Sequence, residues 1–166
     1  MCGQHIGLDF DTGDEKSSFK RLLENDFIHR NANFLHTTYS HRDTAPRTRV
    51  IFILEHPIFS KEKYSLLTEA FAETFSLGGA DPSCKDPVRL FFGASRCDVL
   101  KLNHILSMHA AAEIVHPYKE NLRQRQRINI ADDAGVLEGN ANGRIRYLLD
   151  KLATAPDGAK WFTLIN

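Results

Sequence analysis

The sequence predicts an α+β fold, in which an antiparallel sheet has helices packed on one face. Three observations predict it. Strand and helix patterns alternate in the order β, α, β, β, α, β over about residues 5–92, a polar turn joins the second and third strands as a hairpin, and 166 residues suffice for a single core. We expect the second face of the sheet to be open for a ligand.

The first half of the chain predicts one strand, one helix and the hairpin. Ile6–Phe10 is a short apolar run and predicts the first strand, and apolar residues at helical spacing predict a helix over Glu15–Arg30. Asn33–Ser40 is rich in β-branched and aromatic residues. Arg47–Glu55 contains a continuous apolar run, which indicates burial on both faces. These two segments predict the paired strands of the hairpin.

The next stretch predicts a helix and the last strand. Pro57 is expected to end the third strand, and Lys61–Leu77 carries an apolar stripe typical of a helix closed by Gly78-Gly79. Val88–Phe92 predicts the fourth strand, and Val99-Leu100 can add another short one. The order of elements is that of the split-βαβ or RNA-recognition-like plan, on which the ends of the first, second and last strands can converge.

The C-terminal part predicts helical structure around a polar linker. His104–Asn121 is helical in part, with an expected interruption at Pro117, and Arg144–Ala153 predicts a last helix. The stretch between them is rich in polar residues, Gly and Asn. We therefore expect a first domain, a linker and the start of a further helical region, at residues 1–122, 123–142 and 143–166.

Composition excludes several classes of protein. Hydrophobic residues make up 42% and charged residues 25%, which are globular values. Basic and acidic residues number 21 each, so any affinity for nucleic acid must come from local clustering of charge. Cys2, Cys84 and Cys97 are scattered and lack zinc spacing, which indicates free thiols in a reducing cytosol. No apolar run reaches the about 18 residues of a membrane span, so we expect a soluble cytoplasmic protein.

Asp9 and Asp11 are the most informative residues of the chain. They lie two residues apart at the end of the first strand, where their side chains would point to the same face. Like charges side by side repel each other unless a cation offsets them, and a divalent metal is an economical choice. Two carboxylates on one strand edge can bridge two ions about 3.5–4 Å apart, as in nucleotidyl transfer. The alternative is a strand that runs into an acidic Asp-Thr-Gly-Asp turn.

Four ordered stretches of the chain carry a resemblance to a known family. They are Thr37–His41, Ala45–Phe52, His56–Ile58 and Gly79–Gly93. Together with the Asp-x-Asp motif, this set resembles the primase-polymerase domain of the archaeo-eukaryotic primase superfamily, in the versions carried by phages and mobile elements. The resemblance covers about residues 5–100. The family usually has more chain before its first motif, so we expect a truncated or unusually small version.

The resemblance implies a role for five residues. The family's hydrophobic-Asp-hydrophobic-Asp motif binds catalytic metal and falls on Asp9 and Asp11. Its small-x-His motif contacts the nucleotide phosphates and falls on His41. The residue two before His41 is Tyr39, which is not small, so the motif matches only if Ser40, directly before the histidine, takes the small position. A later carboxylate completes the metal site, and Asp81 is the first choice. The catalytic and metal-binding set implied is thus Asp9, Asp11 and Asp81.

The implied activity is metal-dependent, template-directed nucleotide transfer on single-stranded DNA, in the replication of a phage, plasmid or other mobile element. Two Mg²⁺ or Mn²⁺ ions would activate the attacking hydroxyl and stabilise the leaving pyrophosphate. The implied partners are a single-stranded DNA template, nucleoside triphosphates, and a helicase domain or protein.

Several assignments keep an alternative. Asp86 and Glu55 follow Asp81 as candidates for the third carboxylate. Arg47 and Arg49 lie two apart on a strand and can bind phosphate, or can pair with Asp43 or Glu55. Arg89 can contact phosphate or form an ion pair with Asp81 or Asp86. We include all three arginines in the expected nucleotide site.

Two other functions compete with nucleotide transfer. A replication-initiation or relaxase-type nuclease needs a His-hydrophobic-His metal pair, whereas His36 and His41 are five residues apart and would lie on opposite faces of a strand. A catalytically silent nucleic-acid-binding module is the second alternative. Bare Asp9 and Asp11 would repel phosphate and argue against it.

Overall fold

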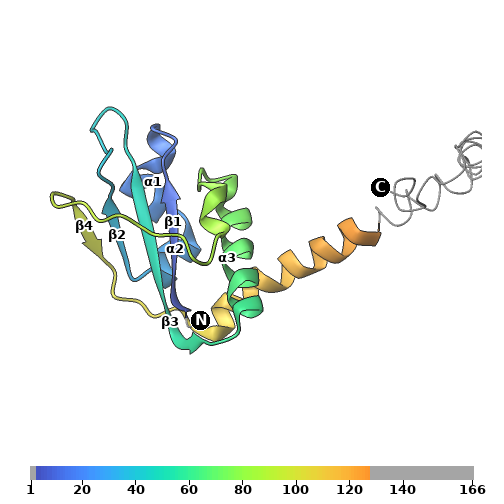
Figure 1. Ribbon diagram of the computed structural model, residues 1–166. Coiled ribbons are helices and arrows are strands. Elements are labelled where there is room, and N and C mark those ends of the chain that lie inside the picture. The colour runs from blue at the N-terminus through green and yellow to red at the C-terminus, as the bar shows by residue number, and fades with distance from the viewer. Residues whose placement is uncertain (1–2, 128–166) are drawn as a thin grey trace, which may run out of the picture. The chain divides into compact units, whose positions relative to one another are not determined.

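The computed structural model describes residues 3–127 and confirms the α+β class (Figure 1). The four strands form one antiparallel sheet, and helices pack against it. In chain order the elements are β1 (Gly3–Phe10), η1 (Glu15–Ser17), α1 (Phe19–Leu23), α2 (Asp26–Asn31), β2 (Phe34–Thr37), β3 (Thr48–Ile58), α3 (Lys61–Ser76), η2 (Pro82–Lys85) and β4 (Val99–Lys101). A further helix covers residues 108–127.

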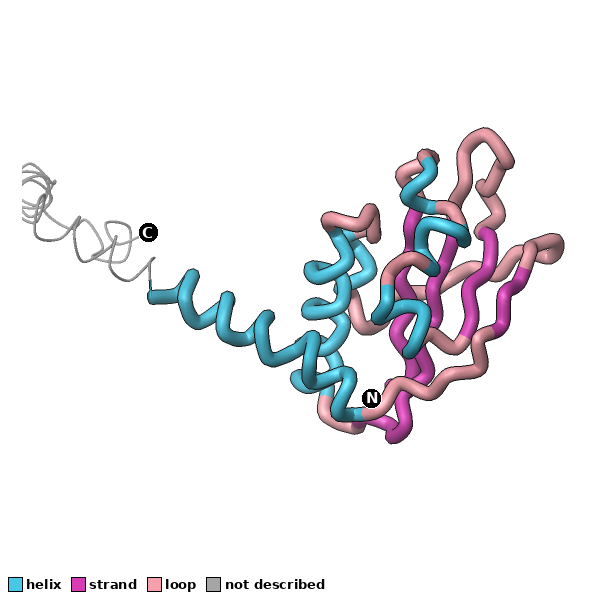
Figure 2. Tube along the Cα trace, turned by 180° about the vertical axis from the view of Figure 1, so that it is seen from behind, coloured by secondary structure: helices cyan, strands magenta, loops and turns pink. Residues whose placement is uncertain are grey.

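The sheet has the strand order β1-β3-β2-β4. Because partners in an antiparallel register project to the same side, the pairing defines two rows of side chains on the face away from the helices. One row holds Gly7, Ile51, Phe34 and Lys101, and the next holds Asp9, Arg49, His36 and Val99. Figure 2 shows the opposite side of the sheet, where α1, α2 and α3 lie.

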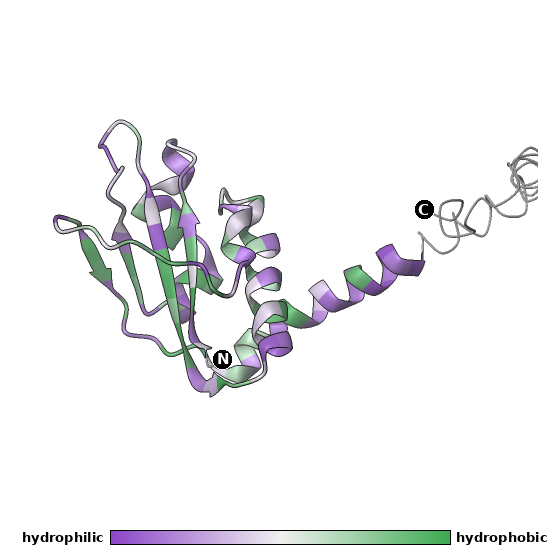
Figure 3. Ribbon diagram, in the orientation of Figure 1, coloured by the Kyte–Doolittle hydropathy of each residue, from purple (hydrophilic) through white to green (hydrophobic). Residues whose placement is uncertain are grey.

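The core lies between the sheet and its helices. Alternate residues of the strands point into it, including Leu8, Phe52 and Leu35, each of which is fully buried. Four phenylalanines from α2, β3 and α3 pack with ring centroids 5.4–6.3 Å apart; they are Phe27, Phe52, Phe71 and Phe75. The strands carry long apolar stretches in Figure 3, whereas the last described turns of the 108–127 helix are hydrophilic. The core thus covers one face of the sheet, and polar side chains of the strands lie on the other face.

The single helix expected over Glu15–Arg30 is wrong, because three short helices occupy this region. Each starts at a side chain that accepts a backbone N–H: Asp14 from Lys16, Ser18 from Arg21, and Asn25 from Phe27 and Ile28. Asp, Ser and Asn at such positions start new helices because they satisfy the free N–H groups of the first turn. Local capping therefore divides a segment whose apolar spacing is continuous.

Three strand boundaries also differ by three residues from the expectation. β1 begins at Gly3 and not at Ile6. β2 stops at Thr37 and does not reach Ser40. β3 continues through Pro57 to Ile58, which pairs with Gly3 after an irregularity in the register. A proline is tolerated there because the ladder is already interrupted next to it.

The fourth strand is β4, and the strand expected at Val88–Phe92 does not form. Residues 86–98, here called the crossing segment, pass over the sheet face that lacks helices and lead to β4 at the far edge, beside β2 (Figure 1). The crossing segment forms no strand ladder and is held by side-chain contacts and by a backbone hydrogen bond from the Thr37 N–H to the Asp98 carbonyl. The face expected to be open is thus partly covered, and the RNA-recognition-like arrangement is not confirmed.

The helix at 108–127 runs through Pro117 without the expected interruption. Proline costs about 3 kcal/mol in a helix interior, but packing can exceed that cost. Ala111 is buried, Ile114 packs against the core, and the Tyr118 hydroxyl donates to Glu69 at 3.3 Å. Residues 123–127, expected to begin a linker, are helical.

By its contacts the chain divides into two units, Met1–Glu120 and Asn121–Asn166. The second unit contains the whole expected linker, and residues 128–142 of it and the helix predicted at Arg144–Ala153 lie outside the described residues. Within residues 3–127, no helix is long and apolar enough to span a membrane.

Candidate functional site at the end of strand β1

A buried ion pair between Asp9 and Arg49 forms the centre of the site. The two residues are partners in the β1–β3 register and project from the same face of the sheet. Arg49 donates from Nε to Oδ1 at 2.5 Å and from a terminal nitrogen to Oδ2 at 3.2 Å. Asp9 is 7% exposed and Arg49 is 8% exposed. The charge of Asp9 is therefore offset by a guanidinium, a partner that the sequence did not indicate.

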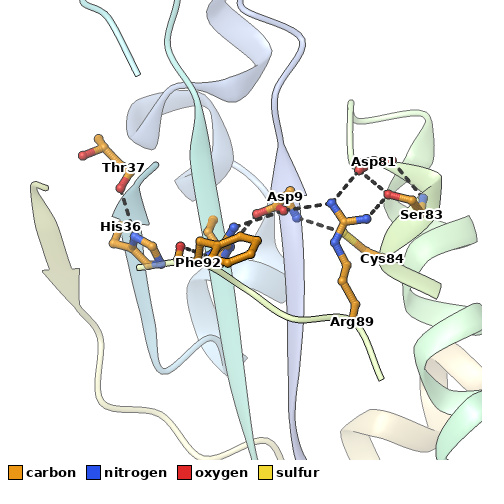
Figure 4. A network of polar contacts seen from close by, with 9 residues as sticks. Asp9, His36, Thr37, Asp81, Ser83, Cys84, Arg89 and Phe92 are labelled. Atoms are coloured by element: carbon orange, nitrogen blue, oxygen red, sulfur yellow. Dashed lines mark hydrogen bonds and ion pairs between the residues drawn. The ribbon is translucent and has the colours of Figure 1, made fainter. Parts of the chain in front are cut away.

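Arg89 joins Asp9 to Asp81 (Figure 4). One terminal nitrogen of Arg89 lies 2.9 Å from Oδ2 of Asp81 and 3.3 Å from Oδ2 of Asp9. The backbone N–H of Asp81 donates to the carbonyl of Asp9 at 2.7 Å, next to a bridge between Phe10 and Ala80. The loop after α3 is thereby fixed against the end of β1. This brings together two of the three carboxylates that the resemblance assigns to the metal site.

Local geometry holds Asp81 in its ionised form. It begins η2, and its carboxylate accepts from the backbone N–H of Ser83 at 2.8 Å and from the Ser83 hydroxyl. Partial burial acts to raise the pKa of Asp81, but the Ser83 hydrogen bonds and the charge of Arg89 outweigh it and lower the pKa below its ordinary value. Burial acts to lower the pKa of Arg89, and the neighbouring Cys84, Asp81 and Asp9 raise it instead. Both groups are charged at neutral pH.

Cys84 supports the site from inside. Its sulfur accepts the backbone N–H of Asp9 at 3.3 Å, and the side chain is 2% exposed. Burial raises the pKa of the Cys84 thiol to about 11. The residue is therefore a neutral thiol at pH 7, inert as a nucleophile, that positions the end of β1.

Phe91 of the crossing segment packs over the same region. The Arg49 guanidinium lies 4.5 Å from the centre of the Phe91 ring and donates to the carbonyl of Phe92 at 2.9 Å. Gly7 leaves room for the ring, since a Cβ at this position would lie 2.7 Å from it. Arg49 thus binds the crossing segment as well as Asp9.

The other predicted carboxylates lie apart from this cluster. Asp11 follows the end of β1 and is exposed, so it does not share a strand face with Asp9 as expected. Asp86 accepts the backbone N–H of Val88 at 3.0 Å, and Glu55 accepts that of Met108 at 3.3 Å. Of the three candidates for the third carboxylate, Asp81 is the one whose contacts reach Asp9. No group of three potential metal ligands is present within residues 3–127.

The predicted phosphate-binding residues Ser40, His41 and Arg47 lie in the turn between β2 and β3. His41 accepts the backbone N–H of Arg47 through Nδ1 at 3.1 Å and is half-buried, whereas Ser40 is exposed. His41 also lines a separate hollow, beside Asp43 and other residues. No contact among the described residues joins this turn to Asp9.

Sequence reasoning missed the supporting residues of the site. It considered Asp43 or Glu55 as partners of Arg49, and it assigned no role to Gly7, Cys84 or Phe91. An arginine in a buried apolar run was a usable signal, because such a charge requires a buried partner. Comparisons with protein-family models, curated proteins and solved structures find no match for this chain.

Proposed function

We propose that the chain is a primase-polymerase-type nucleotidyltransferase that acts on single-stranded DNA at the Asp9 and Asp81 site, in replication of a phage, plasmid or other mobile element. One observation carries the proposal. Asp9 and Asp81 come from distant parts of the sequence, match separate motifs of the resembled family, and lie close enough for Arg89 to contact both carboxylates. The ordered sequence motifs give independent support.

The donor chemistry suits Mg²⁺ or Mn²⁺, which prefer carboxylate oxygens. Asp9, Asp11 and Asp81 would hold the ions, and the ions would neutralise the charge that develops on the transferred phosphoryl group. Asp9 and Asp81 form ion pairs with guanidinium groups. A cation must therefore compete with Arg49 and Arg89 for these oxygens.

The residues of the chain have separable roles in this proposal. Arg49 orients Asp9 through two hydrogen bonds, and Cys84 fixes the backbone of Asp9. Arg89 is the more accessible guanidinium, with its side chain 27% exposed against 9% for Arg49. Arg89 is consequently the better candidate to contact a nucleotide phosphate, with Ser40, His41 and Arg47 on the neighbouring turn as further phosphate ligands.

The test is nucleotide incorporation on a single-stranded template with each nucleotide set and Mn²⁺ or Mg²⁺. We expect activity in the wild type and a loss of several orders of magnitude in Asp81→Asn, because charge stabilisation by a metal supplies several kcal/mol. Asp86→Asn is the matched control and keeps most of its activity. Equal activity of Asp81→Asn and the wild type would refute the assignment.

A second candidate function is a nucleic-acid-binding module without catalysis. The observation in its favour is the ion pairing of Asp9, because Arg49 and Arg89 remove the repulsion between this carboxylate and phosphate. Metal titration separates the two candidates. If the chain is a nucleotidyltransferase, Asp81→Asn lowers its affinity for Mn²⁺. If it is a silent module, its affinity for single-stranded DNA is the same with and without a chelator.

A further inference from the structure

A hollow of about 400 Å³ lies on the sheet face away from the helices, beside the crossing segment. Its walls come from β1, β2, β3 and the crossing segment, and include Phe34, His36, Ile51 and Phe91. Pockets for small ligands have volumes of about 300–1,000 Å³ and combine apolar walls with a few polar groups. The hollow has this size and composition.

Planar groups are the main feature of its walls. The rings of Phe34 and His36 are stacked, with centroids 6.0 Å apart and planes inclined by 28°. They project from alternate positions of β2 onto one face. Phe91 also lines the hollow and is held there by Arg49 and by the absence of a side chain at Gly7. This arrangement suits a flat aromatic ligand.

The polar groups at the hollow select among flat ligands. No carboxylate lines it, and the charge of Arg49 is balanced by Asp9. Lys101 is in register with Phe34, so its side chain leaves the same face, and it is exposed without an ion pair among residues 3–127. His36 uses Nδ1 toward the carbonyl of Thr37 at 2.9 Å, which leaves Nε2 for a ligand. The hollow therefore has stacking surfaces, and the Lys101 charge lies outside its walls, on the same sheet face and next to Phe34 in the register.

We infer that this hollow binds a nucleobase that carries a phosphate, with the base against Phe34 and His36 and the phosphate toward Lys101. The inference rests on the proposed function and adds to it a second position for a base and its phosphate, separate from the phosphate contacts proposed for Arg89 and requiring neither a metal nor Asp81. The base can belong to a free nucleotide or to a single strand, and both present the same chemistry.

The test is calorimetric titration of the full chain in the presence of a chelator, with adenosine monophosphate and with ribose 5-phosphate. We expect binding of adenosine monophosphate, and at least about tenfold weaker binding of ribose 5-phosphate, since stacking of one base contributes about 1–3 kcal/mol. Absence of adenosine monophosphate binding at millimolar concentration would overturn the inference.

Two substitutions locate the ligand. Phe34→Leu keeps an apolar side chain and removes the ring, so affinity for adenosine monophosphate falls about tenfold. Phe59→Leu is the matched control, because Phe59 is 72% exposed and does not line the hollow. Lys101→Ala weakens binding and reduces its dependence on salt. Equal affinity of the Phe34 and Phe59 variants, with both folded by circular dichroism, would refute this location.

Two further experiments distinguish a free nucleotide from a single strand as the ligand, and this inference from the proposed function. A short oligodeoxythymidine that competes with adenosine monophosphate identifies the base of a strand as the ligand, and failure to compete identifies a free nucleotide. Asp81→Asn, expected to be inactive, retains adenosine monophosphate binding. Activity without base binding would refute this inference alone, whereas base binding without activity would refute the proposed function alone.

Discussion

At the scale of single residues, the charge on Asp9 determines the character of the site. A carboxylate that is 7% exposed is costly unless it is paired and hydrogen-bonded, and Arg49 provides both. The same guanidinium contacts Phe91 and the carbonyl of Phe92. Arg49 therefore links the stability of the sheet to the position of the crossing segment.

We predict that Arg49→Met lowers the free energy of unfolding by about 3–5 kcal/mol, because loss of one partner leaves a buried charge poorly compensated. Urea denaturation at pH 7 measures the change. Arg21→Met is the control, since Arg21 pairs with Glu24 on the surface and such pairs contribute about 0–1 kcal/mol. If both variants lost a similar free energy of unfolding, the buried pair of Asp9 and Arg49 would contribute no more to stability than a surface pair.

The lowered pKa of Asp81 predicts the direction in which the stability of the fold changes with pH. Its pKa is lower in the folded state than the ordinary value of 3.8, so the unfolded chain binds the proton more readily. The stability from this carboxylate is complete above the unfolded pKa and is lost as pH falls through the lower folded pKa. Between about pH 5 and pH 2, the free energy of unfolding measured with urea should therefore fall less steeply with decreasing pH in Asp81→Asn than in the wild type. An identical slope would contradict the prediction.

At the scale of elements, the crossing segment is the unusual feature. It lies over the sheet through Phe91, Phe92 and the bond from the Asp98 backbone to the Thr37 hydroxyl at 2.9 Å. Val88, Leu90 and Phe92 have exposed side chains. The missing side chain at Gly7 makes room for the Phe91 ring, and the Thr37 N–H donates to the Asp98 carbonyl at 3.0 Å where the segment reaches β2.

We predict that Gly7→Ala displaces the Phe91 ring and lowers the free energy of unfolding by about 1–3 kcal/mol, as overpacking does. In a Phe91→Ala background the same substitution costs much less, because the clash is gone. A double-mutant cycle by urea denaturation measures this coupling. Gly93→Ala is the control, since a Cβ there meets nothing within 4 Å. If the effects of Gly7→Ala and Phe91→Ala on the free energy of unfolding were additive, the Phe91 ring would not lie against Gly7.

At the scale of the whole described part, the return of the chain after β4 closes the core. The Leu106 N–H donates to the carbonyl of Ile53 at 2.8 Å, and the Glu55 N–H donates to Leu106 at 3.0 Å. The Leu106 side chain is fully buried. This contact extends the sheet at the end of β3 and precedes the 108–127 helix, whose Ala111 enters the same core.

We predict that Leu106→Ala lowers the free energy of unfolding by about 2–5 kcal/mol through loss of buried surface and a residual cavity. Ile105→Ala provides the comparison, because Ile105 is 53% exposed. Chemical denaturation followed by circular dichroism gives both values. Equal, small effects would mean that the segment after β4 is not part of the cooperative core.

Local patterns predicted most of the elements but not all their limits. The apolar spacing of Lys61–Leu77 identified α3, and the continuous apolar run after Arg49 identified β3, because burial imposes periodicity on the residues involved. The helix predicted over Glu15–Arg30 failed because capping by Ser18 and Asn25 competes with the apolar pattern. Both signals are in the sequence, and only the fold shows which prevails.

The sequence by itself determined the α+β class and the hairpin pairing of β2 with β3, and it proposed Asp9 and Asp81 as site residues through separate motifs. Tertiary structure alone decided that β4 pairs with β2, that residues 86–98 cross the sheet, and that Arg49 and Arg89 neutralise Asp9. These features depend on contacts between residues far apart in the chain. Such contacts leave no periodic pattern in the sequence, because their partners are separated by loops of irregular length and not by the regular spacing of a helix or strand.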